Sequence, residues 1–392
     1  MPCDLLMTMP GAWYESWKPF YRYLSQHGLR VHVAPAFSPR RLTELRETGC
    51  FADDCGENAW AVHPLPVRCQ HPHHAASYWF GAQAAEFLRS LAPRALYLLG
   101  EAGYASTYQL LRIREAAYPR AKALLYAAQN VYKAYPFPFS QFERYTFEQV
   151  DMALPLGEEH LAVLRQKGYR GPAHTLPLGV DTDHFRPQEV RELRASLGLP
   201  PKIVGFVGLL VKQRDVVGLV RAVAALGPEV GLLLLAKGPL LPEVQAEIGR
   251  LGIANRTRVI GYVPHREVPR YLNCMDVMAL PSVPVQSGVK WWIRIPNKEQ
   301  FGRVLIEAMA CETAVVGSDC GEIPHVIGDC GLVYPSGDRA ALTESLRTLL
   351  ADDARRKSLA ARGRERAVRH YDWGRVVARF LEVYRPLVEG IE

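Results

Sequence analysis

The sequence lacks any uninterrupted run of 18 or more apolar residues, so it contains no stretch expected to cross a bilayer as a helix. It also lacks low-complexity tracts and short-period repeats, which argues against solenoid and fibrous architectures. Zinc-finger, helix-turn-helix and RNA-binding signatures are missing, so we expect no nucleic-acid partner. The 392 residues, 48% hydrophobic and 22% charged, fit a globular protein of two domains.

Cysteine is scarce, with eight scattered residues, and the first residues lack the basic start and apolar stretch of a signal peptide. We therefore expect reduced thiols and a cytoplasmic protein. One cluster holds residue types that bind zinc: Cys50, Cys55, Cys69, His71, His73 and His74. Its spacing fits no standard zinc site, so we predict no metal and keep these histidines as candidates for lining a substrate cleft.

The net charge of +7 is a mild excess of 47 basic over 40 acidic residues. It favours phosphorylated donors or peripheral contact with an anionic membrane face, and it equally fits an ordinary solvated surface.

Apolar runs alternate with helical stretches, which predicts an α/β fold of parallel sheets covered by helices. A turn-rich segment at 178–187 separates two such halves. We predict an N-terminal domain over 1–178, a C-terminal domain over 188–372 and a last helix over 373–392. The expected strands are 4–8, 30–34, 95–99, 123–127, 152–155 and 174–177, then 203–207, 231–236, 259–260, 277–280, 314–317 and 332–334. The expected helices include 15–26, 104–115 and 158–167, then 216–226, 241–251, 304–310, 339–351, 354–370 and 373–388.

The most informative segment places Glu299 and Glu307 eight residues apart, on either side of Gly302. Gly302 marks a junction between a loop and a helix. Such a junction leaves backbone N–H groups free and carries a partial positive charge, which suits an anion or a sugar oxygen. The two carboxylates can then hold two parts of one ligand. The alternative is a helix with ordinary charged residues, because this spacing alone is common.

This segment, with the turn Gly-Ser-Asp-Cys-Gly-Glu-Ile-Pro at 317–324, resembles the E-x7-E signature of retaining glycosyltransferases of family four. The resemblance implies the GT-B architecture, two Rossmann-like domains facing each other across a cleft, with the last helix crossing back onto the first. It implies that Glu307 binds the ribose of a nucleotide sugar. It assigns four residues to the donor sugar: Glu299, Gln300, Phe301 and Gly302.

Other donor-side residues follow strand ends in the second half. Gly208 would allow close approach to phosphates, and Lys212 and Arg214 would neutralise a diphosphate leaving group. The family usually has Arg directly after this glycine, where this chain has Leu209, and Lys212 is one candidate substitute. The resemblance also assigns three residues to the nucleotide: Gly238, Tyr262 and Val263.

The resemblance places the acceptor in the first half. Gly11 and Ala12 resemble the glycine loop that faces the diphosphate and acceptor, and Glu101 would meet an acceptor hydroxyl. Gln129 stands where many members have His, and an amide cannot act as a base at neutral pH. The front-face route attributed to the family needs no such base. We interpret 283–298 as a loop over the cleft that tunes substrate choice; the alternative is a surface insertion.

The resulting hypothesis is a retaining glycosyltransferase that moves a sugar from a nucleotide-diphosphate sugar to an acceptor hydroxyl, with no metal or other cofactor. Carbohydrate, lipid-linked and small-molecule acceptors all stay open, as do the nucleotide base and the sugar. Two alternatives are a non-catalytic nucleotide-sugar-binding protein and another GT-B enzyme such as a sugar epimerase.

Overall fold

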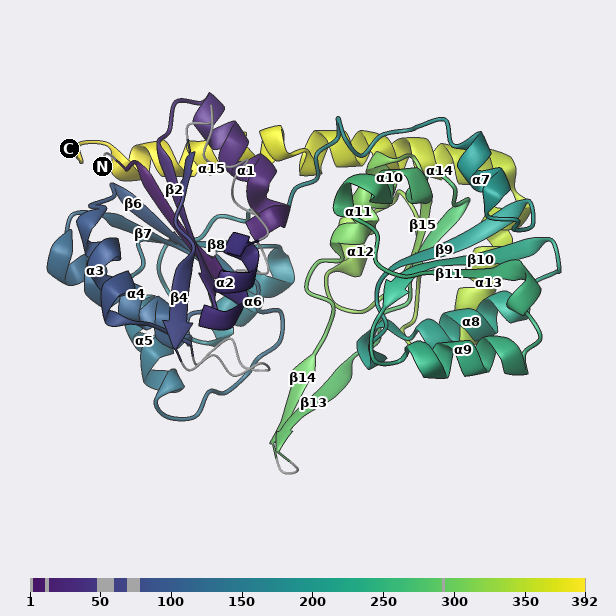
Figure 1. Ribbon diagram of the computed structural model, residues 1–392, viewed down its shortest axis with the longest axis horizontal. Helices are drawn as coiled ribbons and strands as arrows, with labels where there is room; N and C mark the ends of the chain where they lie inside the picture. The colour runs from purple at the N-terminus through teal and green to yellow at the C-terminus, as the bar shows by residue number, and fades with distance from the viewer. Residues whose placement is uncertain (1–2, 11–13, 48–59, 69–77, 291–292, 392) are drawn as a thin grey trace. The chain divides into compact units, whose positions relative to one another are not determined.

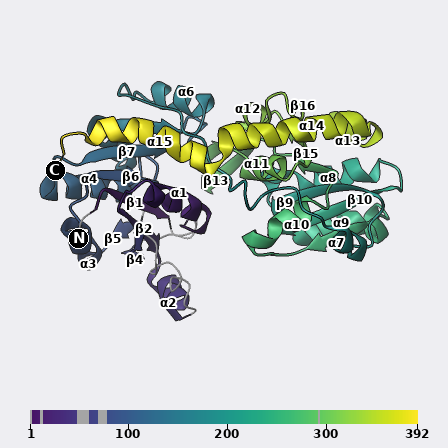
Figure 2. The ribbon, with the colours of Figure 1, turned by 90° about the horizontal axis from the view of Figure 1, so that it is seen from above.

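The computed structural model describes residues 3–10, 14–47, 60–68, 78–290 and 293–391. It divides the chain into two compact units. Unit 1 consists of Met1–Pro177 together with Trp373–Glu392, and unit 2 is Leu178–Asp372. Figures 1 and 2 show that each unit has a central sheet with helices packed against it. The predicted α/β class with parallel sheets is therefore confirmed.

Unit 1 has an eight-stranded sheet in the order β5-β4-β2-β1-β6-β7-β8, with β3 also paired to β2. The pairs are parallel except for β4 with β5. Its strands are β1 (Leu5–Pro10), β2 (Val31–Phe37), β3 (Trp60–Val62), β4 (Leu65–Arg68), β5 (Trp79–Phe80), β6 (Ala95–Leu98), β7 (Lys122–Ala127) and β8 (Met152–Pro155). Its helices are α1 (Tyr14–Gln26), α2 (Pro39–Glu47), α3 (Ala82–Ser90), α4 (Ala105–Ala117), α5 (Phe139–Gln149), α6 (Glu158–Gln166) and α15 (Trp373–Val388).

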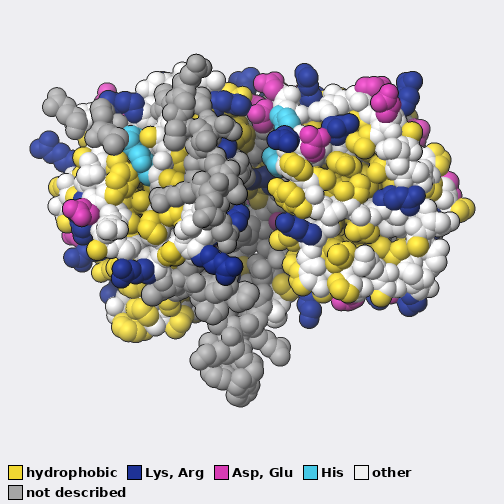
Figure 3. Space-filling view, in the orientation of Figure 1, with side chains coloured by type: hydrophobic (Ala, Val, Ile, Leu, Met, Phe, Trp, Pro, Cys, Tyr) yellow, Lys and Arg dark blue, Asp and Glu magenta, His cyan; other side chains and the backbone are white. Residues whose placement is uncertain are grey.

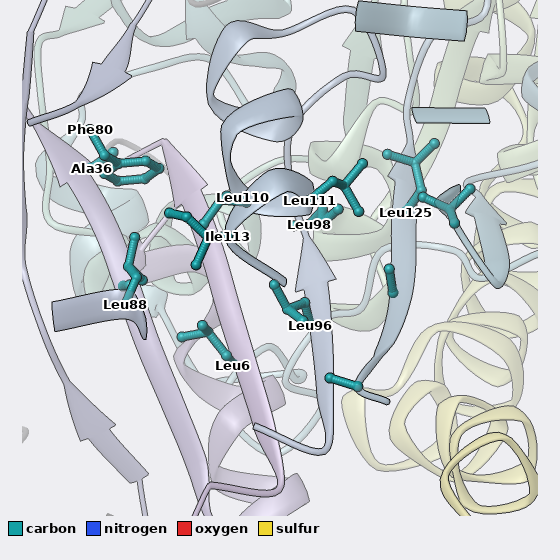
Figure 4. Packing of buried hydrophobic residues seen from close by; sticks show 14 of the residues in the cluster. Leu6, Ala36, Phe80, Leu88, Leu96, Leu98, Leu110, Leu111, Ile113 and Leu125 are labelled. Carbon is teal, nitrogen blue, oxygen red and sulfur yellow. The ribbon is translucent and has the colours of Figure 1, made fainter. Parts of the chain in front are cut away.

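The core of unit 1 is built from apolar side chains of the central strands and α4. Leu96 and Leu98 of β6, Leu125 of β7, and Leu110 and Leu111 of α4 are all almost fully buried, and Figure 4 shows them lying together. The strands read as continuous apolar runs because both faces of a parallel sheet are covered by helices.

Unit 2 has a six-stranded sheet in the order β11-β10-β9-β12-β15-β16, and its pairs are parallel. A separate two-stranded sheet pairs β13 with β14. Its strands are β9 (Lys202–Leu209), β10 (Val230–Lys237), β11 (Thr257–Ile260), β12 (Val277–Leu280), β13 (Val285–Lys290), β14 (Ile293–Asn297), β15 (Ala314–Ser318) and β16 (Leu332–Tyr334). Its helices are α7 (Arg191–Ser196), α8 (Val216–Ala224), α9 (Leu241–Arg250), α10 (Val268–Leu272), α11 (Arg303–Ala310), α12 (Ile323–Ile327), α13 (Arg339–Ala351) and α14 (Asp353–Arg366).

Several details differ from the sequence-based expectations. Residues 174–177 form no strand: His174 and Leu176 donate to β8 carbonyls, but Pro172 and Pro177 have no N–H and cannot extend the ladder. The short strands β3, β4 and β5 were not predicted, because a hydrophobic period cannot be recognised in two to four residues. The expected loop 283–298 contains a β-hairpin, and α14 ends at Arg366, where a π-helical turn (Ala367–Tyr371) begins.

The last helix, α15, belongs to unit 1 because its buried face carries large aromatic rings. Trp373 packs against Trp17 and Phe20 of α1, with ring centroids 5.5 Å and 5.6 Å away. Phe380 contacts Phe20 at 5.3 Å and Tyr97 of β6 at 5.5 Å. Aromatic rings bury large apolar areas, so this cluster fixes α15 against α1 and the sheet.

We predict that Trp373→Ala lowers the free energy of unfolding by about 3–5 kcal/mol, because it removes a fully buried indole and leaves a cavity. The midpoint of denaturant unfolding measures the loss. Trp79→Ala is the matched control, since the Trp79 side chain is 37% exposed and its removal should cost less than about 1 kcal/mol. Equal losses in both variants would contradict the role given to the aromatic cluster.

Candidate functional site

The candidate site of unit 2 lies where several parallel strands end. The chain enters the sheet at β9, runs outward through β10 and β11, and then crosses to β12 on the other side of β9. Ligands of open α/β sheets bind at the carboxyl ends of the strands beside such a switch point. Gly208 and Leu209 end β9, Gly238 follows β10, and Ser282 follows β12, so these residues stand at that edge.

Glu299 is the most constrained residue of this edge. It is only 5% exposed, and its carboxylate accepts hydrogen bonds from the Arg214 guanidinium and from Ser282 Oγ at 3.0 Å. Arg214 also donates to Ser282 Oγ at 3.2 Å. A buried carboxylate is costly without such partners, so the ion pair holds Glu299 in one orientation. The backbone carbonyl of Glu299 also accepts from Glu322 N at 3.2 Å, in the Gly-Glu-Ile-Pro turn.

Gly302 sets the direction of the helix that follows Glu299. Its φ of +79° is left-handed, a conformation that favours glycine, and a Cβ there would lie 2.8 Å from Leu280 Cδ2, so that side chain would also have to shift. Helix α11 begins at the next residue. Gln300 is exposed, whereas the Phe301 ring is buried and packs edge-on against Tyr371 at 5.8 Å. Phe301 can therefore offer a ligand only its backbone groups.

Glu307 lies inside α11 and is the second carboxylate of the motif. It is 7% exposed, and its Oε1 lies 3.0 Å from His265 Nε2. The His265 ring in turn contacts Phe185, with centroids 5.0 Å apart. His265 was not predicted; its signal was its place directly after the Gly-Tyr-Val-Pro segment that carries Tyr262 and Val263.

The ends of β10 and β11 form a third part of the site. Gly238 has a φ of +150°, and a Cβ there would lie 2.6 Å from the Leu210 carbonyl oxygen, so a side chain cannot fit. The ammonium of Lys237 lies 4.4 Å from the centre of the Tyr262 ring, which is 71% exposed. An exposed ring with a cation beside it can stack on a flat, electron-rich group.

The basic residues predicted for a leaving group lie in a 3₁₀ turn, Lys212–Arg214, after β9. The Arg214 guanidinium forms an ion pair with the Glu299 carboxylate, whereas the Lys212 side chain is exposed. Leu209 is 54% exposed, an apolar side chain at the edge where a cation was expected. On the viewed face in Figure 3, Lys and Arg side chains of unit 2 are dispersed among hydrophobic and acidic ones.

Unit 1 has its own small cavity at the ends of β6 and β7, and both Glu101 and Gln129 line it. Burial raises the pKa of Glu101 to about 7, although the positive charges of Lys133 and Lys167 oppose the shift. The Gln129 side chain donates to the Tyr135 hydroxyl at 3.1 Å. The cavity wall also includes Glu143, Lys167 and His160, and Lys167 pairs with Glu143.

The structure says less about the remaining predicted positions. Gly11 and Ala12 lie outside the described residues, as does the cluster of Cys50, Cys55, Cys69, His71, His73 and His74. Within the part of the chain that the structure describes, no group of three or more His, Cys, Asp or Glu could hold a metal ion. None of the described helices combines the length and apolarity that crossing a membrane demands.

The family model that matches this sequence covers residues within unit 2. Residues 189–366 match the family model of glycosyl transferases group 1. Alpha-maltose-1-phosphate synthase of Mycolicibacterium smegmatis is 33% identical over 236 residues, 55% of this chain and 57% of that protein. D-inositol 3-phosphate glycosyltransferase of Xylanimonas cellulosilytica is 34% identical over 227 residues, 54% and 50% of the two chains. The chain thus matches about half the length of these curated relatives.

Structural similarity extends over both units. HepE of Anabaena in complex with UDP superposes with a TM-score of 0.76 at 16% identity, covering 98% of this chain and 100% of that chain. Sucrose-phosphate synthase of Thermosynechococcus elongatus gives a TM-score of 0.72 at 20% identity, covering 98% and 99%. These likenesses confirm the predicted GT-B fold class of two Rossmann-like units.

We predict that Glu101 makes unit 1 less stable as the pH rises. A carboxyl whose pKa is raised by folding contributes fully below its unfolded value of about 4.5, and that contribution is lost as the pH rises through about 7. A shift of this size corresponds to roughly 3 kcal/mol. Glu101→Gln should therefore raise the melting temperature relative to wild type at pH 8 and much less at pH 4.5.

The matched control for this titration is Glu86→Gln, an exposed glutamate of α3 in the same unit. Its difference from wild type should not change with pH. A Glu101→Gln difference that is equally flat would contradict the raised pKa.

Proposed function

We propose that this protein is a glycosyltransferase that transfers a sugar from a nucleotide-diphosphate sugar to an acceptor hydroxyl, with retention at the anomeric carbon. The observation that carries the proposal is the pair of buried carboxylates on either side of Gly302, at the carboxyl edge of a Rossmann-like sheet. The match of residues 189–366 to group 1 glycosyl transferases supports it independently.

The donor would bind to unit 2. The carboxylate of Glu299, with Gln300 and the backbone of Phe301 and Gly302, would bind the sugar hydroxyls. Glu307 would accept hydrogen bonds from the ribose, and its contact with His265 keeps the carboxylate in one position. Gly208 and Gly238 leave room for phosphate and ribose, and the exposed Tyr262 ring with Val263 would lie along the base.

Chemistry would depend on stabilising the departing diphosphate. The bond from C1 to the diphosphate oxygen breaks, the acceptor oxygen forms a bond to C1 on the same face, and its proton passes to the departing phosphate oxygen. Lys212, Arg214 and the first amides of α11 would offset the negative charge that develops. This route needs no metal and no side-chain base, which suits an acceptor side that carries Gln129 rather than His.

The acceptor would bind to unit 1, where Glu101 and Gln129 line one cavity. Carboxyl and amide groups form hydrogen bonds with hydroxyls, so these two side chains would contact a hydroxyl group of a carbohydrate, a lipid-linked sugar or a small polyhydroxy compound. The family resemblance additionally assigns Gly11 and Ala12 to the acceptor side. We further propose that the protein works in the cytoplasm, with contact at a membrane surface if its acceptor is a lipid.

A second candidate is a nucleotide-sugar-binding protein without catalysis. The exposed Leu209 favours it, because an apolar side chain at that edge contributes no charge to a leaving diphosphate. The two candidates share the donor site and differ only in turnover.

We predict that one class among UDP-, GDP- and ADP-sugars raises the melting temperature by several degrees, because a saturating ligand stabilises the folded state by about 3 kcal/mol. Glu307→Ala should weaken that ligand about 10- to 100-fold, since charged hydrogen bonds are lost. Glu344→Ala, at an exposed glutamate of α13, is the control and should bind normally. An unchanged shift in Glu307→Ala would remove Glu307 from the nucleotide site.

We also predict that Glu299→Gln lowers donor turnover about 100-fold or more while nucleotide binding stays within threefold of wild type, as for other transition-state stabilising groups. Hydrolysis of the nucleotide sugar without acceptor measures the turnover. Wild-type protein that binds a donor, yet neither hydrolyses nor transfers it with any acceptor offered, would favour the non-catalytic candidate.

A further inference from the structure

The segment between β12 and Glu299 forms a hairpin that projects from the six-stranded sheet of unit 2, as Figure 1 shows. Strands β13 and β14 pair from Val285 with Asn297 up to Lys290 with Ile293, with an irregularity between Gly288 and Lys290. They form a sheet of their own. A two-stranded hairpin alone is marginally stable in water, so its attachment to the body of the unit matters.

The two stems of the hairpin, meaning Val283 where the chain leaves for it and Asn297 where the chain returns, are both attached to one residue, Gln213. Before the first strand, the backbone N–H of Val283 donates to the Gln213 carbonyl oxygen at 2.8 Å. At the end of the second strand, the Asn297 side chain donates from Nδ2 to Gln213 Oε1 at 3.1 Å. Gln213 therefore contacts the chain both where it leaves for the hairpin and where it returns.

These contacts matter because of where Gln213 lies in the sequence. It is the middle residue of the turn Lys212–Arg214, so it lies between the two cations assigned to the diphosphate. The stem residues are equally close to the site in sequence: Val283 follows Ser282, and Asn297 lies two residues before Glu299. Ser282 and Arg214 both donate to the Glu299 carboxylate.

We propose that Gln213 and Asn297 form a positioning pair that fixes the cationic turn relative to Glu299. This inference rests on the proposed function, because it concerns the stabilisation of the leaving diphosphate. Arg214 is already fixed by its ion pair, so the turn backbone and Lys212 depend on the second attachment through Gln213. Neither amide is assigned contact with the substrate, and both act through their neighbours.

A positioning role predicts a loss in rate without an equal loss in binding. Catalytic groups lose effect when they move by about half an ångström, whereas affinity for the nucleotide depends on Glu307 and the glycine edges. Gln213→Ala and Asn297→Ala should each lower kcat about 10- to 50-fold. The affinity for the nucleoside diphosphate should stay within about threefold of wild type.

The decisive variant exchanges the two amides. Gln213→Asn and Asn297→Gln each alter the length of one side chain by a methylene and should each lower kcat about 5- to 20-fold. The double variant restores the summed length and the amide pair, so it should recover to within about threefold of wild type. In the alanine pair, the double variant should be no slower than the slower single variant, because both remove the same contact.

The control is Gln245→Ala, an exposed glutamine on α9 of the same unit with no role assigned in the site, which should keep wild-type kcat. Additive losses in the alanine pair, or no recovery in the exchanged pair, would overturn the positioning role. Single variants with unchanged kcat would overturn it as well. The proposed function fails separately, and earlier, if wild-type protein neither binds nor turns over any nucleotide sugar.

Discussion

The ion pair between Glu299 and Arg214 is the interaction on which the candidate site depends. A carboxylate that is almost fully buried needs donors, and its donors come from the turn after β9 and from Ser282 after β12. The same carboxylate directly precedes the loop that starts α11. One electrostatic requirement thus brings together the cationic turn, the end of the central strand β12 and the first turn of a helix. Those are the groups that a sugar and a diphosphate would need.

The carboxyl groups at the candidate sites of the two units differ in the partners that surround them. In unit 2, Glu299 and Glu307 lie against Arg214 and His265, and both stay fixed in hydrogen bonds. In unit 1, Lys167 is bound to Glu143, and burial raises the pKa of Glu101 to about 7. The first arrangement suits recognition by permanent acceptors. The Glu101 carboxyl can instead either donate or accept a hydrogen bond near neutral pH, depending on its protonation. That would suit contact with substrate hydroxyls of varied chemistry.

The sequence predicted the central elements well, because the buried strands of a parallel sheet appear as apolar runs. Strands β12 and β16 have the predicted bounds, and Gly302 directly precedes α11 at the predicted junction between loop and helix. The short strands β3, β4 and β5 escaped prediction because their pairing, rather than their composition, makes them strands. The hairpin escaped for a related reason: its second strand holds Pro296, and its stems are fixed by Gln213, a long-range contact that no local period reports. Likewise, the burial of Phe301 became visible only with Tyr371 beside it.

The position of α15 has a consequence for the order in which the protein is made. Unit 2 is one continuous segment inserted into unit 1. The C-terminal part of unit 1 is joined to the rest of that unit by hydrogen bonds from the Tyr384 hydroxyl to the Asp4 carbonyl, next to β1, and from the Arg94 guanidinium, next to β6, to the carbonyls of Val388 and Ile391. During synthesis, the aromatic face of α1 is therefore complete long before its cover exists. Unit 2 can fold as it emerges from the ribosome, whereas unit 1 must wait for the last helix. The apolar surface of α1 is exposed during that interval, when the nascent chain is most prone to aggregate.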